Sequence, residues 1–124
     1  MFLLFLRAYL QLMVFDRYLR RNAFAALYGR VRNQPTRAIA AAPDAAAQIC
    51  RAVDVAAIWY PRQVLCLQRS AATTCLLRRC GVDAQLVIGV QQIPFRAHAW
   101  VETGGCVVND KPYMREMYAV LDRC

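Results

Sequence analysis

The hydrophobic pattern of the chain changes near Gly81, and this change constrains the fold more than any other feature. Before it, apolar residues recur at the three- and four-residue spacing of amphipathic helices. After it, residues 83–90 form a nearly continuous apolar run, which predicts a central strand covered on both faces. Further strands are predicted at 95–102 and 106–109. Helices followed by a small antiparallel sheet indicate an α+β fold.

Three helices are predicted ahead of the sheet, because proline or glycine interrupts the helical repeat between them. Residues 29–42 lack a clear repeat and are predicted to be a linker, while residues 91–94 are predicted to be a turn. The length suits a single domain, 1–124, with an N-terminal helical region at 1–57 and a core at 58–124. The expected helices are 3–28 (ending at Gly29 or breaking near Asn22), 43–59 and 66–79.

The charge of the chain is strongly positive, and arginine supplies it. Sixteen basic residues stand against eight acidic ones, and all the basic residues except Lys111 are arginine. Because guanidinium groups bind carboxylates in a bidentate fashion, this balance favours an acidic peptide or protein partner. A nucleic-acid surface is the competing interpretation. The arginines are scattered, however, and no zinc-finger spacing, RNP-like motif or helix-turn-helix is present, so no nucleic-acid partner is predicted.

The six cysteines do not form the spacing of a disulfide framework or of a zinc site. No Cys-x-x-Cys motif occurs, and Cys75 and Cys80 have no matching second pair. We therefore expect no metal, no cofactor and a location in the reducing cytoplasm. One cysteine is expected to be functional and the others to pack as small apolar residues.

Residues 1–15 are apolar enough to suggest a signal peptide or a membrane span, but their polar residues argue against both. Arg7 interrupts the apolar run instead of preceding it, as a signal peptide requires. Arg7, Gln11 and Asp16 also leave the run short of the ~20 apolar residues that a span needs. We expect a helix that is buried or faces a partner, and peripheral contact with a membrane is the alternative.

Cys66, His98 and Asp110 occur in an order and in local contexts that suit a nucleophile, a base and an orienting carboxylate. Cys66 opens a predicted helix, where unpaired N–H groups and the helix dipole stabilise a thiolate. His98, the single histidine, lies in the predicted strand 95–102, and Asp110 follows the next strand. These are the parts of a cysteine hydrolase. The N–H groups at Cys66 and the amide of Gln63 are candidate oxyanion donors.

The loop after residue 102 decides whether the imidazole and the carboxylate share a face of the sheet. A three-residue loop, 103–105, places His98 directly opposite Asp110. A two-residue loop shifts the pairing by one residue and turns Asp110 to the other face. We therefore expect the longer loop or a bulge. The same register places Trp100 opposite Val108, on the face of His98, where Trp100 is predicted to line the substrate pocket.

Five segments carry a family resemblance: Cys66-Leu-Gln-Arg-Ser70, Leu76-Leu-Arg-Arg-Cys-Gly81, Leu86-Val-Ile-Gly-Val90, Pro94-Phe-Arg-Ala-His-Ala-Trp-Val-Glu102 and Asn109-Asp110. They resemble the stand-alone leader peptidases of lasso peptide biosynthesis, a branch of the transglutaminase-like, or papain-like, cysteine protease superfamily. The resemblance extends over roughly residues 58–121. It implies a catalytic helix packed on a small antiparallel sheet, with the triad in the three roles given above. One departure is Ala71-Ala72-Thr73, which is smaller and more polar than the bulky aliphatic residues typical of the family.

The resemblance implies removal of the leader segment from a ribosomally made precursor peptide, before a lactam synthetase closes the ring with ATP. The family recognises leaders with a small winged-helix domain. Residues 1–57 are predicted to be helical throughout and have no room for it, so a separate recognition protein is an implied partner. Two alternatives remain: a transglutaminase-like acyl transferase, which uses the same triad, and a non-catalytic basic module that binds peptides.

Overall fold

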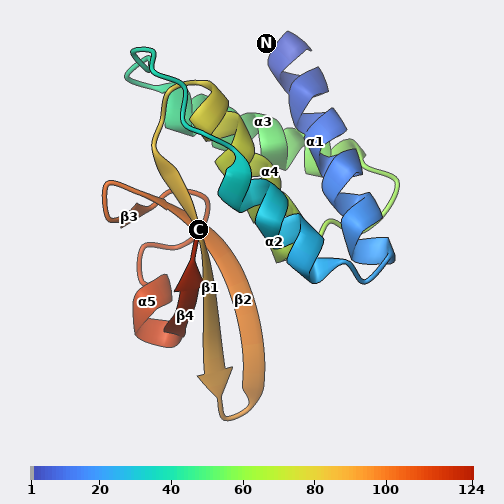
Figure 1. Cartoon of the computed structure of the whole chain (residues 1–124), viewed down its shortest axis with the longest axis vertical. Coiled ribbons are helices and arrows are strands. Elements are labelled where there is room, and N and C mark those ends of the chain that lie inside the picture. Colours follow the sequence, from blue (N-terminus) through green and yellow to red (C-terminus); the bar gives the residue numbers. More distant parts are fainter. Residues whose placement is uncertain (1) are drawn as a thin grey trace.

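A computed structural model describes residues 2–124, so the predicted helical region 1–57 is described from Phe2 onward (Figure 1). The helices gather at one end of the molecule and the sheet extends from them, which confirms the predicted α+β class. The division at residue 57 stays a prediction. The elements are α1 (Phe2–Arg20), α2 (Phe24–Asn33), α3 (Ala45–Trp59), α4 (Cys66–Arg79), β1 (Ala84–Gln92), β2 (Phe95–Thr103), β3 (Cys106–Val107), α5 (Met114–Met117) and β4 (Ala119–Arg123).

The sheet is antiparallel, with the strand order β3-β2-β1-β4. β1 is therefore a central strand, as its apolar sequence predicts. β1 and β2 form a long hairpin that pairs Ala84 with Thr103 at one end and Gln92 with Phe95 at the other. The turn is thus shorter than the predicted 91–94. β3 pairs with only the last two residues of β2, which leaves the outer edge of β2 without a neighbouring strand over most of its length.

The first predicted helix divides into two. α1 ends at Arg20, and Asn22 has a φ of 52°, in the left-handed region that asparagine tolerates better than most residues. The break near Asn22 is therefore correct, whereas Gly29 lies inside α2 and is not a C-cap. The predicted linker is correspondingly shorter, because residues 29–33 are helical and the non-helical segment begins at Gln34.

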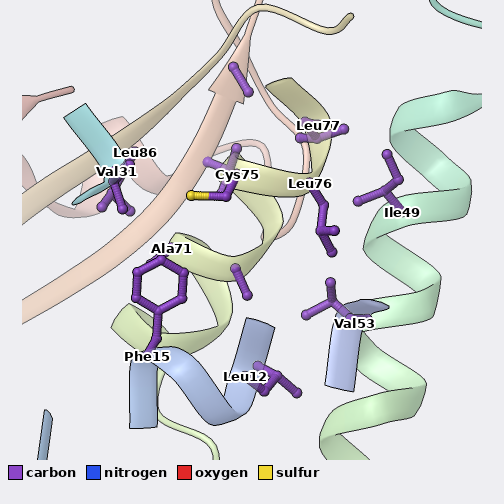
Figure 2. Close-up of a cluster of buried hydrophobic side chains, with 14 of the residues drawn as sticks. Leu12, Phe15, Val31, Ile49, Val53, Ala71, Cys75, Leu76, Leu77 and Leu86 are labelled. Carbon is purple, nitrogen blue, oxygen red and sulfur yellow. The ribbon is translucent and has the colours of Figure 1, made fainter. Parts of the chain in front are cut away.

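The main core packs the helices against one face of the sheet, around α4. Figure 2 shows Leu12 and Phe15 of α1 and Ile49 and Val53 of α3 beside this helix. Every residue of α4 from 71 to 78 is buried, including the small residues Ala71, Ala72 and Thr73. α4 is therefore buried in the core although Ala71, Ala72 and Thr73 are smaller than the bulky aliphatic residues typical of the family. Close packing depends on how well neighbouring side chains fit together, and not on the size of each one.

α1 has two apolar faces, one buried and one exposed. The apolar residues from which the helix is predicted lie on the exposed face. Ala8, Leu12 and Phe15 point into the core. The periodic residues that predict the helix point outward; they are Leu3, Leu6, Leu10 and Met13, joined by Phe2. The helix is thus not buried all round, and the predicted peripheral membrane contact stays a prediction. Among residues 2–124, no helix combines the length and apolar content needed to cross a membrane.

Candidate active site

Cys66 is the first residue of α4, and a buried glutamine fixes this end of the helix. The Gln68 side chain accepts a hydrogen bond from the Leu65 N–H at 3.4 Å and donates one to the Leu12 carbonyl at 2.9 Å. The first bond closes the opening turn of α4 and the second ties that turn to α1. Because Gln68 is almost fully buried, these bonds hold the half-buried Cys66 at a defined place.

Cys66 and His98 line the same shallow pocket, which has a volume of about 110 Å³. The rest of the lining is apolar and includes Phe24 from α2 and Leu67 from α4. The structure therefore brings the predicted nucleophile and the predicted base to one accessible hollow. Apart from these two side chains, the hollow suits an apolar group of modest size.

His98 and Asp110 form a short hydrogen bond, with 2.7 Å between Nε2 and Oδ2. The two side chains are 22% and 18% exposed, so the bond is largely shielded from water. The Lys111 N–H donates to the other carboxylate oxygen at 2.8 Å. Burial alone raises the pKa of Asp110, but the hydrogen bonds from His98 and Lys111 outweigh it and hold that pKa below its ordinary value. A carboxylate partner keeps the proton on Nε2 and leaves Nδ1 free to accept one.

The register of β2 and β3 differs from the prediction. Thr103 pairs with Cys106, so the loop contains two residues, Gly104 and Gly105, and the predicted three-residue loop is wrong. Continuing the same register, the Val108 N–H donates to the Val101 carbonyl at 2.9 Å, and Val108 does not lie opposite Trp100. In a regular ladder of this register Asp110 would project from the face opposite to His98.

Asn109 explains how Asp110 reaches His98 in spite of this register. Its Oδ1 accepts the Val101 N–H at 2.8 Å, in place of a backbone carbonyl of the neighbouring strand. Its Nδ2 donates to Ser70 Oγ at 3.0 Å, and the Ser70 hydroxyl donates to the Ala99 carbonyl at 3.1 Å. The Asn109 side chain thus provides the hydrogen-bond acceptor that the Val101 N–H of β2 needs, while the backbone at Asn109 leaves the ladder. Asp110 therefore no longer follows the alternation of faces along a strand, and its side chain can reach His98.

Aromatic rings support His98 from its own face of the sheet. Its ring centroid lies 5.3 Å from that of Tyr118 and 6.2 Å from that of Trp100. Gly89 is paired with His98 and makes room for both rings, because a Cβ there would lie 2.5 Å from Trp100 and 2.8 Å from Tyr118. Trp100 is 0% exposed and is not among the pocket-lining residues. Trp100 therefore lies behind the imidazole, and the prediction that it lines the substrate pocket is wrong.

Glu102 orients Trp100 through a buried ion-pair network. Its carboxylate is 2% exposed and accepts the Trp100 indole N–H at 2.8 Å. Arg115 and Arg123 bind the same carboxylate at 3.0 and 2.7 Å. Burial raises the pKa of Glu102, but these hydrogen bonds outweigh it and lower the pKa below its ordinary value. The ionised carboxylate therefore connects β2, α5 and β4 behind the imidazole.

The Glu102→Gln variant is expected to have a free energy of unfolding roughly 3 kcal/mol lower than the wild type, because it leaves two arginines without their buried carboxylate partner. Because the pKa of Glu102 is lowered in the folded protein, its contribution is present at neutral pH and is lost as the pH falls through that value. Urea unfolding at pH 7, with the exposed Glu116→Gln as the control, measures the difference. Equal midpoints for the two variants would show that the network does not stabilise the fold.

The predicted oxyanion donor Gln63 is exposed and does not line the pocket, and no hydrogen bond to its side chain is described in residues 2–124. Its role stays a prediction, as does that of the N–H groups at Cys66. Roles for Ser70, Asn109 and Glu102 were not predicted from the sequence. All three stand inside the segments that carry the family resemblance, so the motifs themselves contained the signal.

None of the six cysteines is bonded to another within the described part of the chain. Burial raises the pKa of both the Cys50 and the Cys75 thiol to about 11. The pKa of the Cys124 thiol is also raised, mainly by burial. These three thiols are therefore protonated at neutral pH, as expected of packing residues. Residues 2–124 bring together no group of three His, Cys, Asp or Glu side chains that could hold a metal ion.

The family of the chain follows from comparisons with known proteins. The family model described as the transglutaminase-like superfamily matches residues 9–123. The chain is also 48% identical over 56 residues to the Microcin J25-processing protein McjB of Escherichia coli. That match covers 45% of this chain and 27% of McjB, so the similar part is about a quarter of the relative's length. No solved structure shows significant similarity to the chain. Because the family model covers most of its length, the chain belongs to the transglutaminase-like superfamily.

Proposed function

We propose that the chain is a cysteine peptidase that removes the leader from a ribosomally synthesised lasso peptide precursor before macrolactam formation. The observation that carries this proposal is the 2.7 Å bond between His98 and Asp110, beside a pocket that His98 shares with Cys66. The similarity to a relative named as a microcin-processing protein supports a precursor peptide as the substrate. A separate winged-helix recognition protein and a lactam synthetase are the proposed partners, and the cytoplasm is the proposed location.

The proposed reaction follows from the chemistry of the three groups. His98 accepts the thiol proton at Nδ1, and the Cys66 sulfur attacks the carbonyl carbon of the scissile bond. The carbonyl oxygen takes the electron pair and is stabilised by N–H groups at the start of α4, with Gln63 as a second proposed donor. His98 then gives its proton to the leaving amine. Water attacks the resulting thioester, with His98 as its base, and restores the thiol.

A transglutaminase-like acyl transferase would form the same thioester and differ only in the acceptor. Incubation of the enzyme with a precursor peptide and an excess of a primary amine separates the two activities. Hydrolysis yields two fragments whose summed mass exceeds that of the precursor by one water, with no amine adduct. A product carrying the amine would identify a transferase. A non-catalytic binding module would leave the precursor intact, and its binding would be sensitive to salt and unaffected by Cys66→Ala.

Iodoacetamide is expected to alkylate Cys66 ahead of the other cysteines at about pH 6.5, since the thiolate is the reactive species and a helix N-terminus favours it. Peptide mass spectrometry at increasing reaction times measures the order of labelling. Cys106 is the internal control, because it is the exposed cysteine and lies outside the pocket. Labelling of Cys106 as fast as Cys66 would contradict an activated thiol.

Asn109→Ala is expected to lower kcat for precursor cleavage by about 100-fold, because Asp110 loses the support that releases it from the ladder. The lost hydrogen bonds also reduce the free energy of unfolding by about 1–2 kcal/mol. The matched control is Asn33→Ala, at the exposed end of α2. KM is expected to change little, since Asn109 is a positioning residue and does not touch the substrate. An unchanged kcat in Asn109→Ala would contradict this role.

A further inference from the structure

A second hollow, remote from Cys66, is lined by arginines from three separate parts of the chain. Arg7 comes from α1, Arg37 from the segment between α2 and α3, and Arg79 is the last residue of α4. The hollow has a volume of about 390 Å³. Leu4, Leu76, Gln34 and Cys80 complete its lining, and no carboxylate is among the lining residues.

The three arginines have no acidic partner within residues 2–124. The arginines that do form ion pairs with carboxylates there lie elsewhere; they are Arg20, Arg32, Arg69, Arg115 and Arg123. Guanidinium groups at pH 7 are always charged, so three of them around one hollow repel each other. An anionic ligand in the hollow would remove this repulsion.

The position of Arg37 is fixed by the fold, although it lies in a non-helical segment. The nearly buried Arg78 donates to the Gln34 carbonyl at 3.2 Å and to the Ala84 carbonyl at 2.9 Å. The Arg37 N–H in turn donates to the Arg78 carbonyl at 2.9 Å. Gly81 allows this close approach, because a Cβ there would lie 2.3 Å from the Ile39 carbonyl oxygen. The segment is thus held against the end of α4.

We propose that this hollow, which we call the arginine hollow, binds an acidic polypeptide segment that presents two or more Asp or Glu side chains. Arginine binds carboxylates in a bidentate fashion, which favours this ligand. Leu4 and Leu76 also line the hollow, so it can contact an apolar side chain between the acidic ones. No aromatic side chain is among the lining residues, so the hollow lacks the stacking platform typical of single-stranded nucleic-acid sites.

The arginine hollow and Cys66 lie at opposite ends of α4. A helix of 14 residues at ~1.5 Å per residue separates them by about 20 Å. About six extended residues would cover the straight line, but residues 71–78 of α4 are buried, so a peptide has to run over the surface and needs more than six. If the proposed function holds, an acidic stretch of the precursor more than about six residues from the scissile bond can occupy the hollow while that bond lies at Cys66. We infer that the precursor is the occupant; an acidic segment of the recognition protein is the competing occupant that the test excludes or identifies.

The binding test needs no cleavage and therefore stands apart from the proposed function. A fluorescein-labelled peptide of alternating Glu and Leu is titrated with the full chain, and anisotropy gives the Kd. We expect the double variant Arg37→Glu/Arg79→Glu to raise the Kd by about tenfold or more. The control is Arg30→Glu/Arg51→Glu, which has the same net charge and also reverses one arginine in the last turn of a helix. It is expected to stay within about twofold of the wild type.

Circular dichroism confirms that each variant is folded before its Kd is interpreted. Equal weakening in the two double variants would overturn the proposal, because the attraction would then depend on net charge alone. Equally tight binding of a labelled oligouridine with the same dependence on Arg37 and Arg79 would also overturn it. For the precursor, Arg37→Glu/Arg79→Glu is expected to raise KM at unchanged kcat. An unchanged KM together with weakened binding of the recognition protein would overturn the precursor as the occupant.

Discussion

Replacement of Cys66 by alanine is expected to lower the rate of precursor cleavage by about 10⁴-fold or more, since no other group in the pocket can form the thioester. The fold is expected to persist, because Cys66 is half-buried at the end of a helix that Gln68 anchors. Mass spectrometry of the products gives the rate, and urea unfolding tests the fold.

Cys106→Ala is the matched control for Cys66→Ala. It removes an exposed thiol from β3, outside the pocket, and is expected to leave the rate unchanged. Full activity of the purified Cys66→Ala variant would remove the proposed mechanism altogether. A comparable loss in both variants would point to a general effect of thiol removal, and not to a nucleophile at Cys66.

Replacement of Asp110 by asparagine is expected to reduce kcat by roughly 10³–10⁴-fold with little change in KM. An amide presents an N–H toward His98 Nε2 as readily as an oxygen, so the proton is no longer kept on Nε2 and Nδ1 is no longer the free base. Because the side chains have nearly the same shape, the hydrogen bond from Lys111 and the path of the backbone are expected to survive. Steady-state kinetics on the precursor separate kcat from KM.

The Asp110→Asn substitution is also expected to change how the free energy of unfolding depends on pH. The pKa of Asp110 lies below its ordinary value in the folded protein. Its carboxylate therefore contributes stability that is fully present above the unfolded pKa of about 3.9 and is lost as the pH falls through the folded value. The wild type is expected to lose stability more steeply than Asp110→Asn between about pH 5 and pH 2. Parallel losses of unfolding free energy in the two proteins would contradict the role of the His98–Asp110 bond.

The elements with the strongest sequence patterns were predictable. α4 begins at Cys66 and ends at Arg79, as the cysteine context and Gly81 predict, and the apolar run of β1 correctly indicates a central strand. In α1 the pattern identifies a helix but not its buried face, because the helix is apolar on two sides. Periodicity measures the spacing of apolar residues; which face is covered depends on α3 and α4, whose positions the pattern does not contain.

The site was only partly predictable, and the register of β3 shows why. Turn length and strand alternation determine the face of Asp110 only if the ladder continues to Asp110. The ladder instead ends near Val108, because the Asn109 side chain supplies the acceptor for the Val101 N–H. Nothing in the alternation of strand residues predicts that a side chain replaces a strand partner. The shared pocket of Cys66 and His98 likewise depends on tertiary packing.

The ion pairs of Glu102 could not be predicted from the sequence, for a different reason. Both cationic partners, Arg115 and Arg123, come from short elements near the end of the chain, α5 and β4. Because fifteen arginines are scattered along the sequence, no spacing rule identifies Arg115 and Arg123 as the partners of Glu102. Their position follows from the pairing of β4 with β1, a contact that only the folded sheet defines.

A leader-derived peptide ending in a vinyl sulfone tests whether Cys66 is the nucleophile and whether His98 activates it. We expect one equivalent of label, located on Cys66 by peptide mass spectrometry. We also expect His98→Ala to slow this labelling by about 100-fold or more. Labelling of Cys66 at the same rate in His98→Ala and the wild type, or labelling of another cysteine instead, would rule out these two roles.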